Sequence, residues 1–286
     1  MTRSRRTFYA VLAFCVAAIL YLAVQEYVDH MRRFPATDLA TAALLDDMFS
    51  RLRHDPYARE EATRAAVASV AELARTGTVR TSETWFALGL FAYASRDFRI
   101  SERAYREAIL LSPNWSWPYT GLGVVLHELE RNDEAEEAFL RAIKLDPGWS
   151  RPHNDLAILL RRLDRFEEAE PYARKAVELA PDEMAPYNNL ANLLVSQGKY
   201  EEAEQAYRTA IALGKFHPAP YYNLACLYSL QRRKKEALDL LEQAFSLDKT
   251  LIAKAKTDAD LASLRKDAAF KTLVRKASRA SARGNP

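Results

Sequence analysis

The chain contains little glycine and almost no cysteine. Only 8 of its 286 residues are glycine, which argues against a β-rich fold with many glycine turns and against a phosphate-binding loop. The two cysteines, Cys15 and Cys226, cannot form a disulfide framework. With 49% hydrophobic and 28% charged residues, the composition also excludes a collagen-like, low-complexity or globally disordered chain.

The sequence also lacks a recognisable catalytic or metal-binding motif. After His127 and Glu128, Arg131 stands where a zinc-protease helix has its second histidine. Neither the G-x-S-x-G pattern of hydrolases nor a glycine-lysine phosphate loop occurs. We therefore predict a protein that is not an enzyme, with no catalytic residues, metal ligands or cofactor, and we expect no small-molecule substrate.

The formal net charge of +3 hides three regions of different sign. Residues 1–33 carry 5 Lys/Arg against 2 Asp/Glu, residues 34–248 carry 26 against 33, and residues 249–286 carry 10 against 3. The acidic body disfavours nucleic acid as a partner, because affinity for nucleic acid comes from Lys and Arg that neutralise phosphates. The basic C-terminal segment is interpreted as a solubilising tail.

An uncharged stretch at residues 8–24 follows three arginines near the N-terminus. As a helix it spans about 26 Å, close to the ~30 Å hydrocarbon core, so we predict that 1–33 form a basic tail and a single-pass membrane anchor. A cleaved signal peptide is the alternative, although apolar residues continue directly after its small-residue site at 16–18. The arginines favour an inner-membrane protein whose main part is extracytoplasmic, or periplasmic in a bacterium, and a cytoplasm-facing orientation stays open.

A period of 34 residues runs through the rest of the chain. Proline recurs at this step: Pro118, Pro152, Pro186 and Pro220. So does leucine followed by a small residue: Leu88, Leu122, Leu156, Leu190 and Leu224. An aromatic ring or a histidine precedes each of these leucines by three positions, and two further columns hold alanine, with Ser101 the exception. These columns divide 82–251 into five units without insertion: 82–115, 116–149, 150–183, 184–217 and 218–251.

Each unit has the pattern of two helices joined by a short polar turn, with proline in the first helical turn and acidic residues opening the second helix. In period, helix-turn-helix form and order of columns, residues 82–251 resemble the tetratricopeptide repeat family. The resemblance implies an all-α fold, a right-handed superhelical solenoid of antiparallel helix pairs that follows the transmembrane helix. We expect a divergent helical hairpin at 34–81, capping helices at 252–276 and a disordered basic tail at 277–286.

In such solenoids the first helix of each unit lines a concave groove, and the resemblance implies that a protein or extended peptide binds there. Nine groove positions fall in the last three units: Arg151, Asn154, Asp155, Arg161, Asn188, Asn189, Asn192, Tyr222 and Asn223. The first two units place Phe86, Trp117 and Thr120 at comparable positions. An asparagine amide offers a donor and an acceptor, which match those of a peptide backbone.

Family members that clamp a C-terminal carboxylate carry a lysine where this chain has Asn154, Asn188 and Tyr222. We therefore expect no complete clamp, although Asn192 and Asn223 match its asparagines. The sequence predicts a non-enzymatic, membrane-anchored scaffold or adaptor for the assembly or maturation of an envelope complex. The alternative is a co-chaperone-like adaptor that faces the cytoplasm and recruits a partner to the membrane. Homo-oligomerisation is left open.

Overall fold

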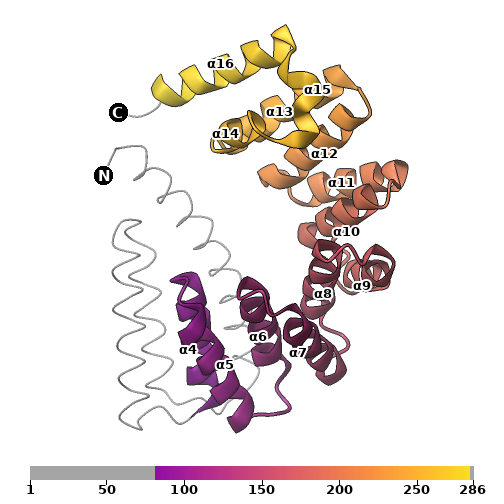
Figure 1. The fold of residues 1–286 in the computed structure, drawn as a ribbon. Helices are drawn as coiled ribbons and strands as arrows, with labels where there is room; N and C mark the ends of the chain where they lie inside the picture. Colours follow the sequence, from indigo (N-terminus) through magenta and orange to yellow (C-terminus); the bar gives the residue numbers. More distant parts are fainter. Residues whose placement is uncertain (1–80, 284–286) are drawn as a thin grey trace. The chain divides into compact units, whose positions relative to one another are not determined.

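The computed structural model describes residues 81–283, which form α-helices and one short 3₁₀ helix and contain no strand (Figure 1). The predicted anchor at 8–24 and, except for its last residue, the predicted hairpin at 34–81 lie outside the described residues. Among the residues that are described, every helix is too short or too polar to span a bilayer. The chain divides into two compact units after Asp146, and each is described in turn.

The first of these two compact units, which ends at Asp146 and holds the first two repeats, contains two helical hairpins. Its helices are α4 (Ser82–Ala94), α5 (Phe98–Leu111), α6 (Ser116–Glu128) and α7 (Asn132–Leu145). Helix α4 packs on α5, α6 packs on α7, and α5 joins the two hairpins by packing on α6. Each hairpin thus buries the apolar faces of its own pair and leaves one helix to contact the next pair.

The second unit continues with three hairpins and ends in four further segments (Figure 1). The hairpins are α8 (Ser150–Arg162) with α9 (Phe166–Leu179), α10 (Met184–Ser196) with α11 (Tyr200–Leu213), and α12 (Pro218–Leu230) with α13 (Lys234–Leu247). The first helices lie side by side, because α10 contacts both α8 and α12. The final segments are α14 (Leu251–Ala255), η1 (Ala259–Leu261), α15 (Ala262–Arg265) and α16 (Ala268–Arg283).

The small-residue columns of the sequence are buried within the hairpins. The alanine column in the second helix that has no exception is completely buried in all five repeats: Ala108, Ala142, Ala176, Ala210 and Ala244. In the second alanine column of the repeat, the first repeat has Ser101 in place of alanine. Ser101 is also fully buried, and its hydroxyl donates a hydrogen bond of 2.7 Å to the carbonyl oxygen of Gly89 on α4. The serine therefore keeps the tight packing without leaving a buried polar group unpaired.

One residue in each interhelical turn has a left-handed backbone conformation. These residues recur every 34 positions: Arg96, Glu130, Asp164, Gly198 and Arg232. The amide of the residue after each of them bonds back to the carbonyl oxygen five residues earlier, as from Arg233 to Tyr228 at 2.8 Å. This is the Schellman arrangement that ends an α-helix by satisfying its last carbonyls. It fixes the direction in which each second helix leaves the turn.

The side chains of the column of aromatic rings and histidine form hydrogen bonds at the junctions between repeats. Tyr221 donates from its hydroxyl to the carbonyl oxygen of Lys215 at 3.1 Å, six residues earlier. His153 makes the same kind of contact through Nε2, 3.3 Å from the carbonyl oxygen of Pro147. His153 is buried, and this burial lowers the pKa of its imidazole. The histidine thus occupies the structural place of a tyrosine.

The last four segments continue the repeat in altered form. Ser263 on α15 bonds to Ser229 on α12, and Lys276 on α16 bonds to Glu242 on α13, both 34 residues apart. Three short segments therefore take the place of a sixth first helix, and α16 takes the place of its second helix. Helix α16 continues to Arg283, which corrects the prediction of a disordered tail from residue 277; residues 284–286 lie outside the described part.

Candidate functional site

Two of the predicted groove residues in the first unit are core residues. Phe86 is 4% exposed, because its ring packs against Trp115 at 4.9 Å and Trp117 at 6.0 Å between ring centroids. Thr120 is 3% exposed, and its hydroxyl points back to the carbonyl oxygen of Ser116, 3.5 Å away. These burials correct the prediction for Phe86 and Thr120. Trp117 is half-buried and remains accessible.

Tyr222 is also removed from the predicted binding surface. It is 1% exposed, and its hydroxyl donates to Asp258 Oδ2 at 2.8 Å. The ammonium group of Lys254 lies 4.5 Å from the centroid of its ring. Burial and the neighbouring Asp258 carboxylate raise the pKa of Tyr222. The C-terminal segments thus cover this side chain, which is the physical reason for the correction.

Five half-buried asparagines lie together on the neighbouring helices α8, α10 and α12, and we call them the asparagine row: Asn154, Asn188, Asn189, Asn192 and Asn223. Their amides are hydrogen-bonded across the helices. Asn189 donates to Asn154 Oδ1 at 2.8 Å. Asn223 donates to Asn188 Oδ1 at 3.0 Å and to Asn192 Oδ1 at 3.2 Å. The structure therefore brings together residues that the sequence predicted separately, and their mutual bonds fix their orientation.

The hydrogen bonds leave a defined donor and a defined acceptor in the row. Asn192 Oδ1 accepts from the Tyr207 hydroxyl at 2.6 Å and from Asn223, while Asn192 Nδ2 makes no hydrogen bond within residues 81–283. Asn223 uses both hydrogens of its Nδ2 in the row, and its Oδ1 accepts none there. Asn192 can therefore still donate and Asn223 can still accept. Tyr207 was missed by the sequence reasoning because it occupies a core column.

A buried carboxylate adjoins one end of the row. Asp155 Oδ1 accepts from Asn154 Nδ2 at 3.2 Å, and its Oδ2 lies 3.6 Å from Arg151 Nε. Asp155 Oδ2 is buried and has no hydrogen-bond partner among the described residues. Burial raises the pKa of this carboxyl group against the opposing effect of Arg151.

Arg161, at the C-terminal end of α8, is a half-buried cation. No hydrogen bond or ion pair joins it to another residue in the described segment. Burial and the neighbouring Arg162 lower the pKa of its guanidinium group, and the nearby Tyr207 and Asp164 oppose that effect. Arg161 can therefore receive an anionic group from a ligand, since a buried cation is costly to leave unpaired.

Three possible metal ligands converge beside Tyr222. Within residues 81–283, the thiol of Cys226 and one oxygen each of Asp258 and Asp260 lie within 4.8 Å of one another. Burial and the two carboxylates raise the pKa of the Cys226 thiol. Both oxygens of Asp258 already accept hydrogen bonds, from the Tyr222 hydroxyl and from the Asp260 amide. We assign no metal to this group.

Comparison with known proteins identifies the repeat. Models described as tetratricopeptide repeat match residues 86–148, 150–215 and 182–250. The fold is similar to that of PilW, titled a type IV pilus biogenesis factor, with TM-score 0.60, 19% identity and 69% of this chain aligned to 92% of that one. Pseudomonas aeruginosa pilF has TM-score 0.53 and 19% identity over 68% of this chain and 97% of its own. Curated protein sequences give no match.

A larger solenoid is similar over more of the chain. The APC/C hetero-tetramer Cut9–Hcn1 has TM-score 0.63 and 16% identity, with 94% of this chain aligned to 54% of that chain. At these identities the structural likeness shows a shared fold and leaves the ligand of this chain undefined.

Proposed function

Because this chain belongs to the tetratricopeptide repeat family, whose members are protein-interaction scaffolds, we propose that it binds an extended segment of a partner protein along α8, α10 and α12. The bound segment lies in the concave groove that the first helices of such repeats line. The protein acts as a non-enzymatic scaffold, and its contribution is to hold the partner. The contact surface is the asparagine row with Arg151, Asp155 and Arg161 at its margins.

The observation that carries this proposal is the donor and acceptor left over in the asparagine row. Asn192 Nδ2 can donate to a main-chain carbonyl, and Asn223 Oδ1 can accept from a main-chain amide. An extended peptide presents both groups whatever its side chains are. Since the row is held by its own hydrogen bonds, little side-chain entropy is lost on binding.

The charged groups beside the row give the segment a preferred chemistry. Arg161 forms no ion pair in the described part of the chain, so it pairs with an acidic side chain or a C-terminal carboxylate of the partner. Asp155 Oδ2 is buried and lies 3.6 Å from Arg151 Nε, so Asp155 positions Arg151 beside the row. The preferred segment therefore carries an acidic group toward the C-terminal end of α8.

The test compares two double variants of the tagged, detergent-solubilised full chain. Asn189→Ala with Asn223→Ala removes two members of the row and spares Asn192, on which the buried Tyr207 depends. Asn114→Ala with Gln205→Ala removes two exposed amides outside the row and serves as the matched control. Copurifying proteins are identified by mass spectrometry. We expect the row variant to recover about tenfold less partner, equivalent to about 1.4 kcal/mol.

Circular dichroism checks that both variants retain the helical content and melting temperature of the wild type. Equal partner recovery by the two variants and the wild type would count against the asparagine row as the binding surface. It would direct attention to the convex face or to residues 34–81.

We extend the proposal to the assembly or maturation of an envelope complex, with the chain anchored through residues 8–24. The support is the uncharged stretch and the arginines before it, which favour an extracytoplasmic repeat domain. Fusions of alkaline phosphatase and of a fluorescent protein to the C-terminus test this orientation. Phosphatase activity without fluorescence agrees with it. Fluorescence without phosphatase activity would instead favour the adaptor that faces the cytoplasm.

A further inference from the structure

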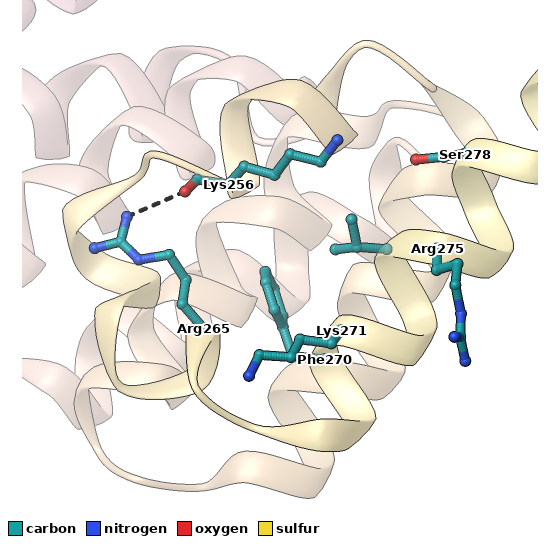
Figure 2. A pocket seen from close by; sticks show the side chains of 7 residues that line it. Lys256, Arg265, Phe270, Lys271, Arg275 and Ser278 are labelled. Carbon is teal, nitrogen blue, oxygen red and sulfur yellow. Dashed lines mark hydrogen bonds between the residues drawn. The ribbon is translucent and has the colours of Figure 1, made fainter.

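A pocket of about 390 Å³ opens at the C-terminal end of the second unit, and none of its lining residues belongs to the asparagine row. Figure 2 shows Lys256 and Arg265 on the side of α14 and α15, and Lys271, Arg275 and Ser278 along α16. The ring of Phe270 lies between the two sides and is buried, so it forms an apolar floor together with Val274. The α16 residues share a face because they are spaced by three or four positions.

The pocket concentrates positive charge without any acidic residue in its lining. Four of its seven lining residues are Lys or Arg. None of these four forms an ion pair with a carboxylate in residues 81–283, and Arg265 donates only to the backbone carbonyl of Lys256, at 3.4 Å. No carboxylate in the lining offsets these four charges, so the pocket attracts an anion.

Neighbouring carboxylates are engaged by other groups. Asp267 pairs with Lys234 and also accepts from the amide of Ala269. Glu242 pairs with Lys276 at 2.8 Å. Asp267 and Glu242 thus attach α16 and its preceding turn to α13. The four pocket cations are left to a ligand.

We propose that this pocket binds a phosphate ester group. A phosphate monoester carries about −1.5 to −2 charge at neutral pH and three acceptor oxygens, so it neutralises more of the pocket than a single carboxylate does. A guanidinium group can donate two parallel hydrogen bonds to such oxygens, and Figure 2 shows Arg265 and Arg275 at opposite sides of the pocket, so either one can make this contact by turning its side chain toward the ligand. The apolar floor at Phe270 and Val274 accommodates the carbon-bearing part of the molecule.

The test uses two soluble probes with the same phosphate: glycerol 3-phosphate and dihexanoyl phosphatidic acid. Their binding to the full chain in nonionic detergent at low salt is measured by calorimetry. Lys271→Gln with Arg275→Gln removes two exposed pocket cations. Lys266→Gln with Arg279→Gln removes two exposed cations outside the pocket lining and is the charge-matched control. We expect the pocket variant to bind at least about tenfold more weakly, and the control within about twofold of wild type.

The two probes distinguish the source of the phosphate. Tighter binding of dihexanoyl phosphatidic acid than of glycerol 3-phosphate supports a lipid headgroup, and equal binding supports a soluble phosphate ester. Absence of phosphate binding, or equal weakening by the pocket and control variants, would overturn the proposal. Tighter binding of a tetraglutamate peptide at the same pocket would also overturn it, because the site would then recognise carboxylates. None of these results depends on the asparagine row, so the groove proposal is tested separately.

Discussion

The left-handed residue in each interhelical turn is held in a conformation that suits glycine, yet only one of the five positions carries it. Gly198 has φ of +74°, while Arg232 adopts +61° at the equivalent place one unit later. In this region the Cβ of an L-residue comes too close to the following carbonyl oxygen, at a cost of about 1–2 kcal/mol. The 6→1 hydrogen bonds of the turn maintain the conformation in all five units.

Arg232→Gly is therefore expected to stabilise the protein by about 0.5–1 kcal/mol, after allowing for the greater freedom of glycine in the unfolded chain. Arg232 is exposed, and its side chain makes no hydrogen bond or ion pair within the described residues that the change would remove. The reciprocal variant Gly198→Ala should be destabilised by about 1 kcal/mol. Urea unfolding followed by circular dichroism measures both. A less stable Arg232→Gly protein would show that the turn tolerates arginine without strain.

At the scale of helices, a polar cluster joins α11 to α12 and to the turn between α12 and α13. Glu204 on α11 pairs with Arg233, accepts from the Tyr228 hydroxyl at 2.7 Å, and pairs with Arg208 at 2.9 Å. Burial alone would raise the pKa of Glu204, but these donors outweigh it and lower the pKa to about 2. Since the folded state holds the ionised form, this contribution to stability is present above the ordinary glutamate pKa. It is lost as the pH falls toward 2.

Glu204→Gln should lower the free energy of unfolding by about 1–3 kcal/mol at pH 7. The difference from wild type should shrink as the pH is lowered from about 4.5 toward 2, because the wild-type carboxylate becomes protonated over that range. Glu201→Gln, an exposed acid on the same helix without an ion pair in the described segment, is the control. Urea unfolding at several pH values makes the comparison. A difference that stays constant with pH would contradict the assigned role of Glu204.

The helix pairs were predictable because the same residue types hold the same contacts in every unit. Alanine columns, the junction aromatics and the interhelical turns recur in phase, and each reflects a local packing requirement. The site was predictable only in part. Tyr222 depends on Asp258, which comes from a segment where the repeat pattern is broken. Phe86 depends on two tryptophans of the following unit boundary, and such neighbours cannot be deduced from a single column.

At the scale of the second unit, stability is expected to follow nearest neighbours, because each hairpin contacts the next one in sequence. Ala203→Asp buries an unpaired charge at a fully buried position of α11, so amide hydrogen exchange should rise through α10–α13. Leu264→Asp, at a buried position of α15, should expose α16 and the last hairpin while α8 and α9 stay protected. Uniform loss of protection in both variants would indicate one all-or-none transition of the whole unit.

The constant position of the left-handed turn residue affects how the number of repeats in such a chain can change during evolution. Because the turns recur every 34 residues without insertion from Arg96 to Arg232, any in-frame duplication or deletion of one unit rejoins a turn to a turn. Recombination between unit-encoding segments would therefore yield a longer or shorter solenoid with every hairpin intact. The broken helix at the C-terminal end lacks this equivalence, so lineages would be expected to vary in the number of internal units while retaining the final one.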